Sequence, residues 1–312
     1  MKILYFGAGV IGSITAAKLG VSGHDITVLE RGERLTQVRD RGIVIRHGVT
    51  GEETHIRPAV IETLGRDDYY DMALVPVRAD HLPAILPVLA RNRGIKNILI
   101  MVNTPKGYRG IIDMLGRDRF LLGFPGMGGG LADGVVTYVI AKPLVQPTTF
   151  GEIDGKTTKR LAATVAMFKR AGFPVAVERN MDAWQKTHVC WIMPFAAALY
   201  MAGSSAAALA ERPDILRLMV RSIRECFRAL RTMSVPVTPS KLRMFEWLPA
   251  GLLVEALRRQ LPTPDIEIGA MLHVRNAPGE MRQLCDDLLS IVRGTSVKAG
   301  ALEEIMSCVP RP

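Results

Sequence analysis

The glycine pattern near the N-terminus constrains the fold of this chain more than any other feature. Residues 7–12 read GAGVIG, with the apolar run KILYF before them and a run of small residues after them. A second apolar run, DITVLE, follows at 25–30. A G-x-G-x-x-G pattern in this strand, turn, helix and strand setting is typical of a dinucleotide-binding fold.

Each glycine has its own role in such a turn. Gly7 allows the tight turn, Gly9 lets a pyrophosphate approach the backbone, and Gly12 lets the helix pack closely on the strand. The N–H groups at the start of the helix then face the phosphates. The predicted dinucleotide-binding residues of this turn are Gly7, Gly9, Val10, Ile11 and Gly12.

The end of the second strand bears on the choice of cofactor. An acidic residue at this place binds the ribose hydroxyls of NAD, whereas an arginine accepts the 2'-phosphate of NADP. Glu30 and Arg31 stand side by side here and indicate opposite cofactors. Both charges are also compatible with a solvated strand end.

The rest of the chain predicts the fold class. Further apolar runs at 72–77, 97–102, 120–124 and 135–141 alternate with helical stretches. This α/β alternation predicts a Rossmann-type, doubly wound, mostly parallel sheet. From Met181 onward every segment has a helical pattern. We therefore predict an NAD(P)-binding domain at 1–180 and an all-helical substrate and catalytic domain at 181–312.

Ligands of doubly wound sheets bind at the carboxyl ends of the strands. Arg78 and Asn103 follow two of the predicted strands, and a glycine-rich segment, GFPGMGGG at 123–130, follows a third. These residues are candidates for contact with a cofactor or substrate.

Composition and charge exclude several classes of function. The net charge is +10, but the basic residues are dispersed and lack aromatic neighbours, so we expect no nucleic-acid partner. The four cysteines are scattered, which favours free thiols in the cytoplasm over disulfides or a zinc site. The first strand begins at residue 2, so we expect no signal peptide.

Residues 189–210 are uncharged and long enough to span a bilayer. Pro194, Gly203 and an excess of alanine over leucine favour a buried helix instead, so we expect no membrane partner. Lys186 lies just before this run, near the start of the second domain. A lysine at a cleft between domains can act as a general acid if its surroundings lower its pKa, although most lysines are solvated.

Several motifs together resemble the ketopantoate reductase (2-dehydropantoate 2-reductase) family. They are GAGVIG, LERG, VNTPKG, the ADG at 132–134 and the WQK that contains Lys186. The resemblance spans nearly the whole chain and is thinner after about residue 205. It implies a Rossmann domain joined to a helical domain, and the reduction of a 2-keto acid with NADPH in pantothenate biosynthesis.

The resemblance also implies roles for individual residues. Lys186 is the general acid, Glu280 matches a glutamate near the substrate, and Asn103 matches an asparagine near the nicotinamide. Arg31 meets the 2'-phosphate, and Arg78 stands where the family has a lysine near the phosphates. On this basis we predict NADP (NADPH) as the cofactor, with NAD not excluded.

The departures from the family concern the substrate. In the family, two asparagines follow the catalytic lysine, and here Cys190 and Pro194 (or Met193) stand at their positions. Gly269 or Ala270 stands at the position of a later family serine. These changes would remove hydrogen-bond partners of ketopantoate and still allow hydride transfer, because a site discriminates strongly against a ligand that leaves buried polar groups unpaired. We therefore expect a different keto acid.

Two alternatives remain open at this stage. One is a dinucleotide-binding protein without dehydrogenase activity, and the other is an opine or hydroxy-acid dehydrogenase of the same architecture. The alanine-rich stretch 196–210 is compatible with packing in a homodimer.

Overall fold

The computed structural model describes residues 1–311, apart from the side chain of Pro264. The chain forms two compact units. Unit 1 contains residues 1–103 and 108–181, and unit 2 contains residues 104–107 and 182–312. The predicted range 1–180 included the segment 104–107, which packs with the second unit instead.

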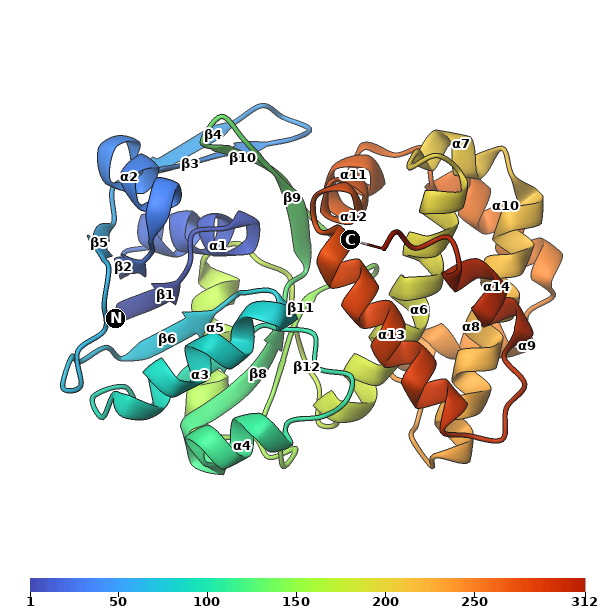
Figure 1. Cartoon of the computed structure of the whole chain (residues 1–312). Coiled ribbons are helices and arrows are strands. Elements are labelled where there is room, and N and C mark those ends of the chain that lie inside the picture. Colours follow the sequence, from blue (N-terminus) through green and yellow to red (C-terminus); the bar gives the residue numbers. More distant parts are fainter. Residues whose placement is uncertain (312) are drawn as a thin grey trace. The chain divides into compact units, whose positions relative to one another are not determined.

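An eight-stranded sheet forms the centre of unit 1 (Figure 1). Its order is β12-β11-β8-β7-β6-β1-β2-β5, and every neighbouring pair is parallel except β11 and β8. The order reverses between β1 and β6, which makes the ends of these strands the expected ligand position. The strands are β1 (Lys2–Phe6), β2 (Asp25–Leu29), β5 (Ala59–Ile61), β6 (Met72–Val75), β7 (Ile98–Ile100), β8 (Phe120–Phe124), β11 (Thr148–Gly151) and β12 (Val175–Val177).

A second sheet of four strands also belongs to unit 1. Its order is β4-β3-β10-β9, with bounds Glu53–Ile56, Ile43–His47, Val135–Ile140 and Met127–Ala132. The glycine-rich segment 123–130, a candidate for ligand contact, completes β8 and begins β9. A Cβ on Gly129 would lie 2.1 Å from the Thr137 carbonyl oxygen, so this glycine permits close pairing of β9 with β10.

The helix α1 (Val10–Val21) lies between the two sheets (Figure 1). It contacts β1 and β2 of the large sheet and all four strands of the small one. Ile14, Ala16, Ala17 and Leu19 are fully buried, as expected of a helix that is covered on more than one side. The other helices of unit 1 are α2 (Gly32–Arg41), α3 (Leu82–Arg91), α4 (Arg109–Leu115) and α5 (Lys159–Arg170), with 3-10 turns at 79–81 and 117–119.

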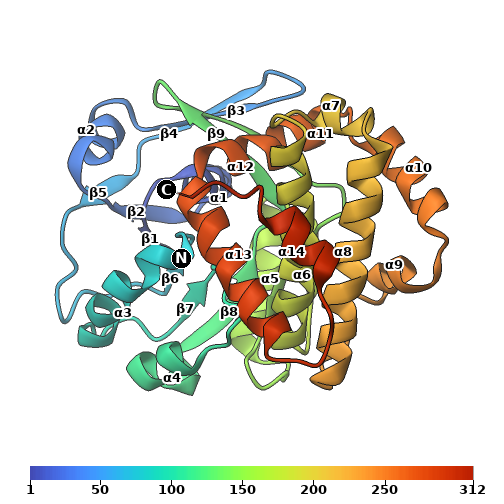
Figure 2. The same cartoon turned by 45° about the vertical axis from the view of Figure 1, so that its right-hand side comes forward.

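Unit 2 is helical apart from its loops (Figure 2), so the predicted fold class is confirmed. Pro249 lies between two of its helices, directly before the second of them. The helices of unit 2 are α6 (Met181–Met201), α7 (Ala206–Ala210), α8 (Pro213–Thr232), α9 (Met244–Trp247), α10 (Ala250–Gln260), α11 (Pro264–Ile266), α12 (Leu272–Asn276), α13 (Pro278–Arg293) and α14 (Gly300–Met306). A 3-10 turn lies at 240–243 and a π-helical turn at 267–271.

The uncharged run 189–210 lies inside this helical unit. It covers the second half of α6 and the whole of α7, and residues from Val189 to Leu199 contribute to the core of unit 2. Within residues 1–311, no helix combines the length and the apolar character that a membrane crossing needs.

Candidate active site

The glycine turn of unit 1 fits a pyrophosphate. Gly7 has a φ of +90°, and a Cβ on Gly12 would lie 2.4 Å from the Gly7 carbonyl oxygen, so neither position suits a side chain. A Cβ on Gly9 would meet no protein atom within 4 Å, which leaves open space beside the start of α1. No side chain caps α1, so its first N–H groups are available to phosphate oxygens.

Two charged side chains hold this turn in place. The Glu30 carboxylate accepts a hydrogen bond of 2.6 Å from the backbone N–H of Ala8. The Arg34 guanidinium donates to the Ala8 carbonyl oxygen at 2.9 Å and to the Ser13 hydroxyl at 3.1 Å. Burial lowers the pKa of Arg34, and the nearby Glu30 carboxylate partly offsets this effect. In the sequence Arg34 is one of many dispersed arginines, and no local pattern marks its contact with the turn.

The other predicted residues of unit 1 lie near the carboxyl ends of β6 and β7. The Arg78 guanidinium pairs with the Asp80 carboxylate at 3.2 Å and contacts the His81 ring nitrogen at 3.0 Å. The side-chain oxygen of Asn103 is buried and has no hydrogen-bond partner among the described residues. An unpaired buried amide oxygen is costly, so Asn103 is suited to accept a hydrogen bond from a ligand.

In unit 2, Lys186 lies in the second turn of α6. Its side chain is only 13% exposed, and its ammonium group pairs with the Asp182 carboxylate one turn earlier. The neighbouring Gln185 accepts hydrogen bonds from the N–H and hydroxyl groups of Thr104, at 2.5 and 2.8 Å. These bonds fix the segment 104–107 to the start of α6.

The same segment also contacts α13. The ammonium group of Lys106 lies 2.7 Å from the Asp287 carboxylate, whose side chain is 12% exposed. Lys106 therefore forms an ion pair within unit 2. Segment 104–107 therefore links α6 to α13 through the contacts of Thr104 and Lys106.

A second cluster of ionisable groups surrounds Glu280 in the first turn of α13. Glu280 is 5% exposed, and its Oε2 lies 3.4 Å from the His273 Nε2 without a hydrogen-bond partner among the described residues. His188 stacks on Trp184, with ring centroids 5.2 Å apart. Burial and the nearby His273 lower the pKa of His188 to about 3. The sequence offered no signal for this grouping beyond the residue types, since His188 and His273 are 85 positions apart.

The positions that depart from the family lie in apolar surroundings. Cys190, Met193 and Pro194 are buried, and Cys190 and Met193 belong to the core of unit 2. Cys226 on α8 belongs to the same core, and burial raises the pKa of its thiol. None of the three side chains offers the amide group of an asparagine.

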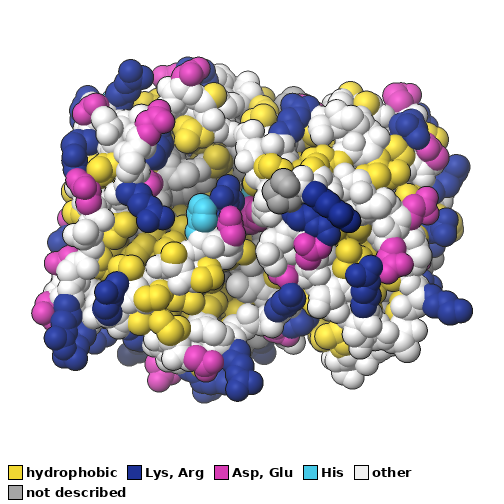
Figure 3. Space-filling model, in the orientation of Figure 1, with side chains coloured by type: hydrophobic (Ala, Val, Ile, Leu, Met, Phe, Trp, Pro, Cys, Tyr) yellow, Lys and Arg dark blue, Asp and Glu magenta, His cyan; other side chains and the backbone are white. Residues whose placement is uncertain are grey.

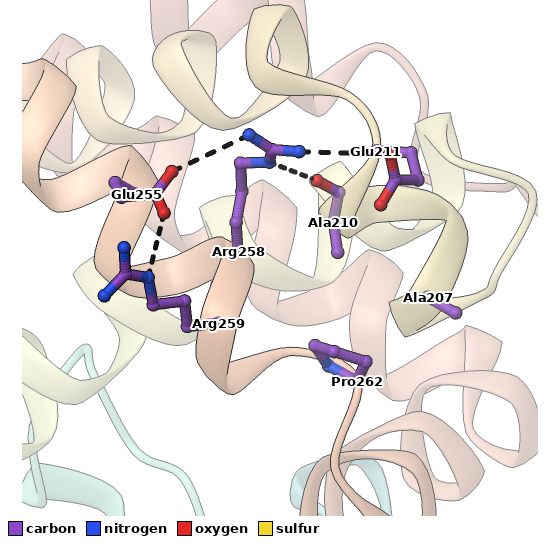
Figure 4. Close-up of a pocket in the computed structure, with 7 residues that line it drawn as sticks. All are labelled: Ala207, Ala210, Glu211, Glu255, Arg258, Arg259 and Pro262. Carbon is purple, nitrogen blue, oxygen red and sulfur yellow. Dashed lines mark hydrogen bonds and ion pairs between the residues drawn. The ribbon is translucent and has the colours of Figure 1, made fainter.

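A surface pocket of about 350 Å³ between α7 and α10 contains none of the predicted site residues (Figure 4). Arg258 donates to the Ala210 carbonyl oxygen and pairs with Glu211 and Glu255, so its charge is already balanced. Lys and Arg side chains are scattered over the face seen in Figure 3 rather than gathered in one patch. No group of three His, Cys, Asp or Glu side chains within the described part of the chain is suited to hold a metal ion.

The fold and the glycine turn define the class of protein, which is a two-unit protein with a Rossmann-type dinucleotide-binding unit. The family model described as "Ketopantoate reductase PanE/ApbA" matches residues 3–155. Residues 3–155 belong to a domain of this family, as the sequence motifs predicted.

Several known proteins are similar to this chain in sequence or in fold. An uncharacterized oxidoreductase of Bacillus subtilis, YkpB, is 24% identical over 190 residues, which cover 60% of this chain and 61% of that protein. The match thus spans less than two thirds of this relative's length. The structure of 2-dehydropantoate 2-reductase from Geobacter metallireducens has a TM-score of 0.81 at 14% identity, over 99% of each chain. D-Mandelate dehydrogenase with NADH and anilino(oxo)acetate has a TM-score of 0.77 at 14% identity, over 99% of this chain and 97% of that one.

Two glycine variants test whether the turn binds a dinucleotide. We expect Gly9→Ala to fold normally, because its Cβ meets no protein atom, and to bind NADH and NADPH at least about tenfold more weakly. Gly12→Ala should lower the melting temperature, because its Cβ collides with the Gly7 carbonyl oxygen. Fluorescence titration and thermal unfolding measure the two effects. Unchanged nucleotide affinity in Gly9→Ala would contradict the assignment of the turn.

The buried histidine predicts a pH dependence of stability. The pKa of His188 is about 3 in the folded protein and about 6.5 when it is unfolded. The unfolded state therefore binds the extra proton, so this contribution to stability is complete above pH 6.5 and falls as the pH drops toward 3. We expect His188→Gln to flatten the pH dependence of the unfolding free energy by at most about 1.4 kcal/mol per pH unit.

Urea denaturation at a series of pH values, followed by tryptophan fluorescence, measures this slope. All three tryptophans, at 184, 191 and 247, lie in unit 2, so the signal reports on the unit that contains His188. His81→Gln is the matched control, because that ring is exposed and lies in unit 1. Equal slopes in the wild type and His188→Gln would show that His188 does not carry the effect.

Proposed function

We propose that this chain is a nicotinamide-dependent oxidoreductase that reduces a 2-keto acid to a 2-hydroxy acid, with Lys186 as the general acid. Membership of the ketopantoate reductase PanE/ApbA family supports the reaction class. The proposed role of Lys186 rests on one observation. Its side chain is largely buried, and its ammonium group pairs with Asp182 at the start of α6. A bound nicotinamide cofactor would supply the hydride.

Negative charge develops on the keto oxygen as the carbonyl carbon is reduced. A positioned ammonium group stabilises that charge and delivers a proton to the oxygen. The Asp182 carboxylate orients the ammonium group of Lys186 through their ion pair. Holding the donor in one orientation before the reaction avoids the cost of ordering it during the reaction.

Asn103 and Glu280 complete the proposed set of catalytic residues. Each has a buried side-chain oxygen that lacks a hydrogen-bond partner among the described residues. We propose that the Asn103 oxygen accepts a hydrogen bond near the nicotinamide, and that Glu280 orients the substrate. Both oxygens are then satisfied by bound ligand, which explains why they are unpaired in the protein alone.

The proposed substrate is a 2-keto acid other than ketopantoate. Cys190 and Pro194 stand where the family resemblance expects asparagines, and both are buried. Apolar groups favour a substrate whose side chain carries no hydroxyl at this place, because a missing hydrogen bond costs roughly 1–3 kcal/mol. The mandelate dehydrogenase of similar fold was crystallised with an oxoacetate derivative that bears an aromatic group.

Several finer predictions from the sequence stay predictions. The NADP preference that the family resemblance implies would rest on Arg31, which is exposed and whose guanidinium forms no hydrogen bond or ion pair with the described residues. Arg78 remains a proposed phosphate contact that would first have to leave Asp80. A cytoplasmic location and a homodimer stay predictions. The role in pantothenate biosynthesis that the family resemblance implies also stays a prediction, and it would require ketopantoate itself as the substrate.

Substitution of the proposed acid tests the function. We expect Lys186→Ala to lower kcat by about 10²–10⁴-fold with any accepted 2-keto acid, because the proton donor is lost. Nucleotide binding should remain, since the glycine turn is in the other unit. Cofactor oxidation at 340 nm against a panel of 2-keto acids measures turnover.

Lys298→Ala is the matched control, because it removes an exposed lysine from the same unit. It should leave kcat unchanged. Turnover of Lys186→Ala at the wild-type rate would overturn the role of Lys186. Tight nucleotide binding by the wild type with no turnover of any keto acid would instead favour a dinucleotide-binding protein without dehydrogenase activity.

A further inference from the structure

We propose that Glu30 makes this protein prefer NADH over NADPH, which reverses the preference predicted from Arg31. The inference rests on the proposed function only in that unit 1 binds a nicotinamide dinucleotide. Glu30 lies directly after β2, at the carboxyl edge of the sheet next to the glycine turn. Its Oε2 accepts the 2.6 Å hydrogen bond from Ala8, and it would lie 3.7 Å from a Cβ built on Gly7.

The backbone directs Glu30 and Arg31 to opposite sides. The N–H of Glu30 continues the ladder of β2 by donating to the Ile61 carbonyl oxygen at 3.0 Å. Arg31 has an extended backbone, with φ −147° and ψ 166°. Successive side chains of an extended segment point to opposite faces. Because the Glu30 carboxylate faces the turn, the Arg31 side chain leaves the backbone on the other face.

Two other arginines near the carboxyl edge of the sheet, Arg34 and Arg78, already form hydrogen bonds or ion pairs within the protein. Arg34 makes four hydrogen bonds, to the Ala8 carbonyl oxygen, the Gln37 side chain, the Gly134 carbonyl oxygen and the Ser13 hydroxyl. A guanidinium group has five N–H donors, so four bonds leave little capacity for a phosphate. Arg78 pairs with Asp80. Neither cation is free to neutralise a 2'-phosphate without breaking contacts within the protein.

The chemistry of the carboxylate then discriminates between the two cofactors. The 2'- and 3'-hydroxyls of the NADH ribose can donate to the Glu30 oxygens, and such charge-assisted bonds are strong. The 2'-phosphate of NADPH has no proton to donate at neutral pH and repels the carboxylate at close range. The Glu30 oxygens are fixed toward the turn by Ala8, so they do not move away easily.

Equilibrium binding tests this inference without any need for turnover. We expect wild-type protein to bind NADH at least about tenfold more tightly than NADPH, as measured by nucleotide fluorescence and by calorimetry. Glu30→Gln keeps an oxygen that can accept from Ala8 but removes the charge. It should bind NADPH about tenfold more tightly than the wild type does, and NADH several-fold more weakly.

Two further variants complete the design. Glu33→Gln removes the same charge from an exposed residue in the first turn of α2, and it should leave both affinities within about twofold. Arg31→Ala should leave NADH affinity within about twofold, because its side chain lies on the other face. Tighter binding of NADPH than of NADH by the wild type would overturn the inference while leaving the proposed function in place. Failure of the wild type to bind either nucleotide would overturn both.

Discussion

The close approach of α1 to the end of β1 is the constraint on which the rest of unit 1 depends. A Cβ on Gly12 would lie 2.4 Å from the Gly7 carbonyl oxygen, so the helix reaches this position only because residue 12 has no side chain. That contact directs the N-terminus of α1 to the carboxyl edge of the sheet. Glu30 and Arg34 then bind the two polar backbone atoms of Ala8 and fix the turn between them.

Unit 2 places ionisable groups inside a helical core and balances most of them locally. Lys186 pairs with Asp182, and Asp287 pairs with Lys106, as buried charges require. Glu280 is the exception, because its Oε2 has no hydrogen-bond donor within the described residues. An unpaired buried oxygen lowers the stability of the folded protein. Under the proposed function, this oxygen is kept unpaired because it binds a ligand.

Local patterns allowed much of this to be predicted from the sequence. The turn at 7–12 and the helical second half follow from glycine spacing and apolar periodicity, which are properties of neighbouring residues. The strand β9 was missed because its glycines are typical of a loop, and only pairing with β10 explains them. The roles of Arg34 and His188 were missed for the same reason, since their contacts join distant segments.

Transfer of deuterium tests the central claim most directly, because it follows the hydride itself. The nucleotide that the wild type binds more tightly would carry deuterium at both C4 positions of its reduced nicotinamide, and the products from aryl and alkyl 2-keto acids would be examined by mass spectrometry and NMR. We predict a 2-hydroxy acid with one deuterium on C2, which the wild type forms and which Lys186→Ala forms about 10²–10⁴-fold more slowly. A product without deuterium at C2, or the same labelled product at an equal rate from Lys186→Ala, would contradict it.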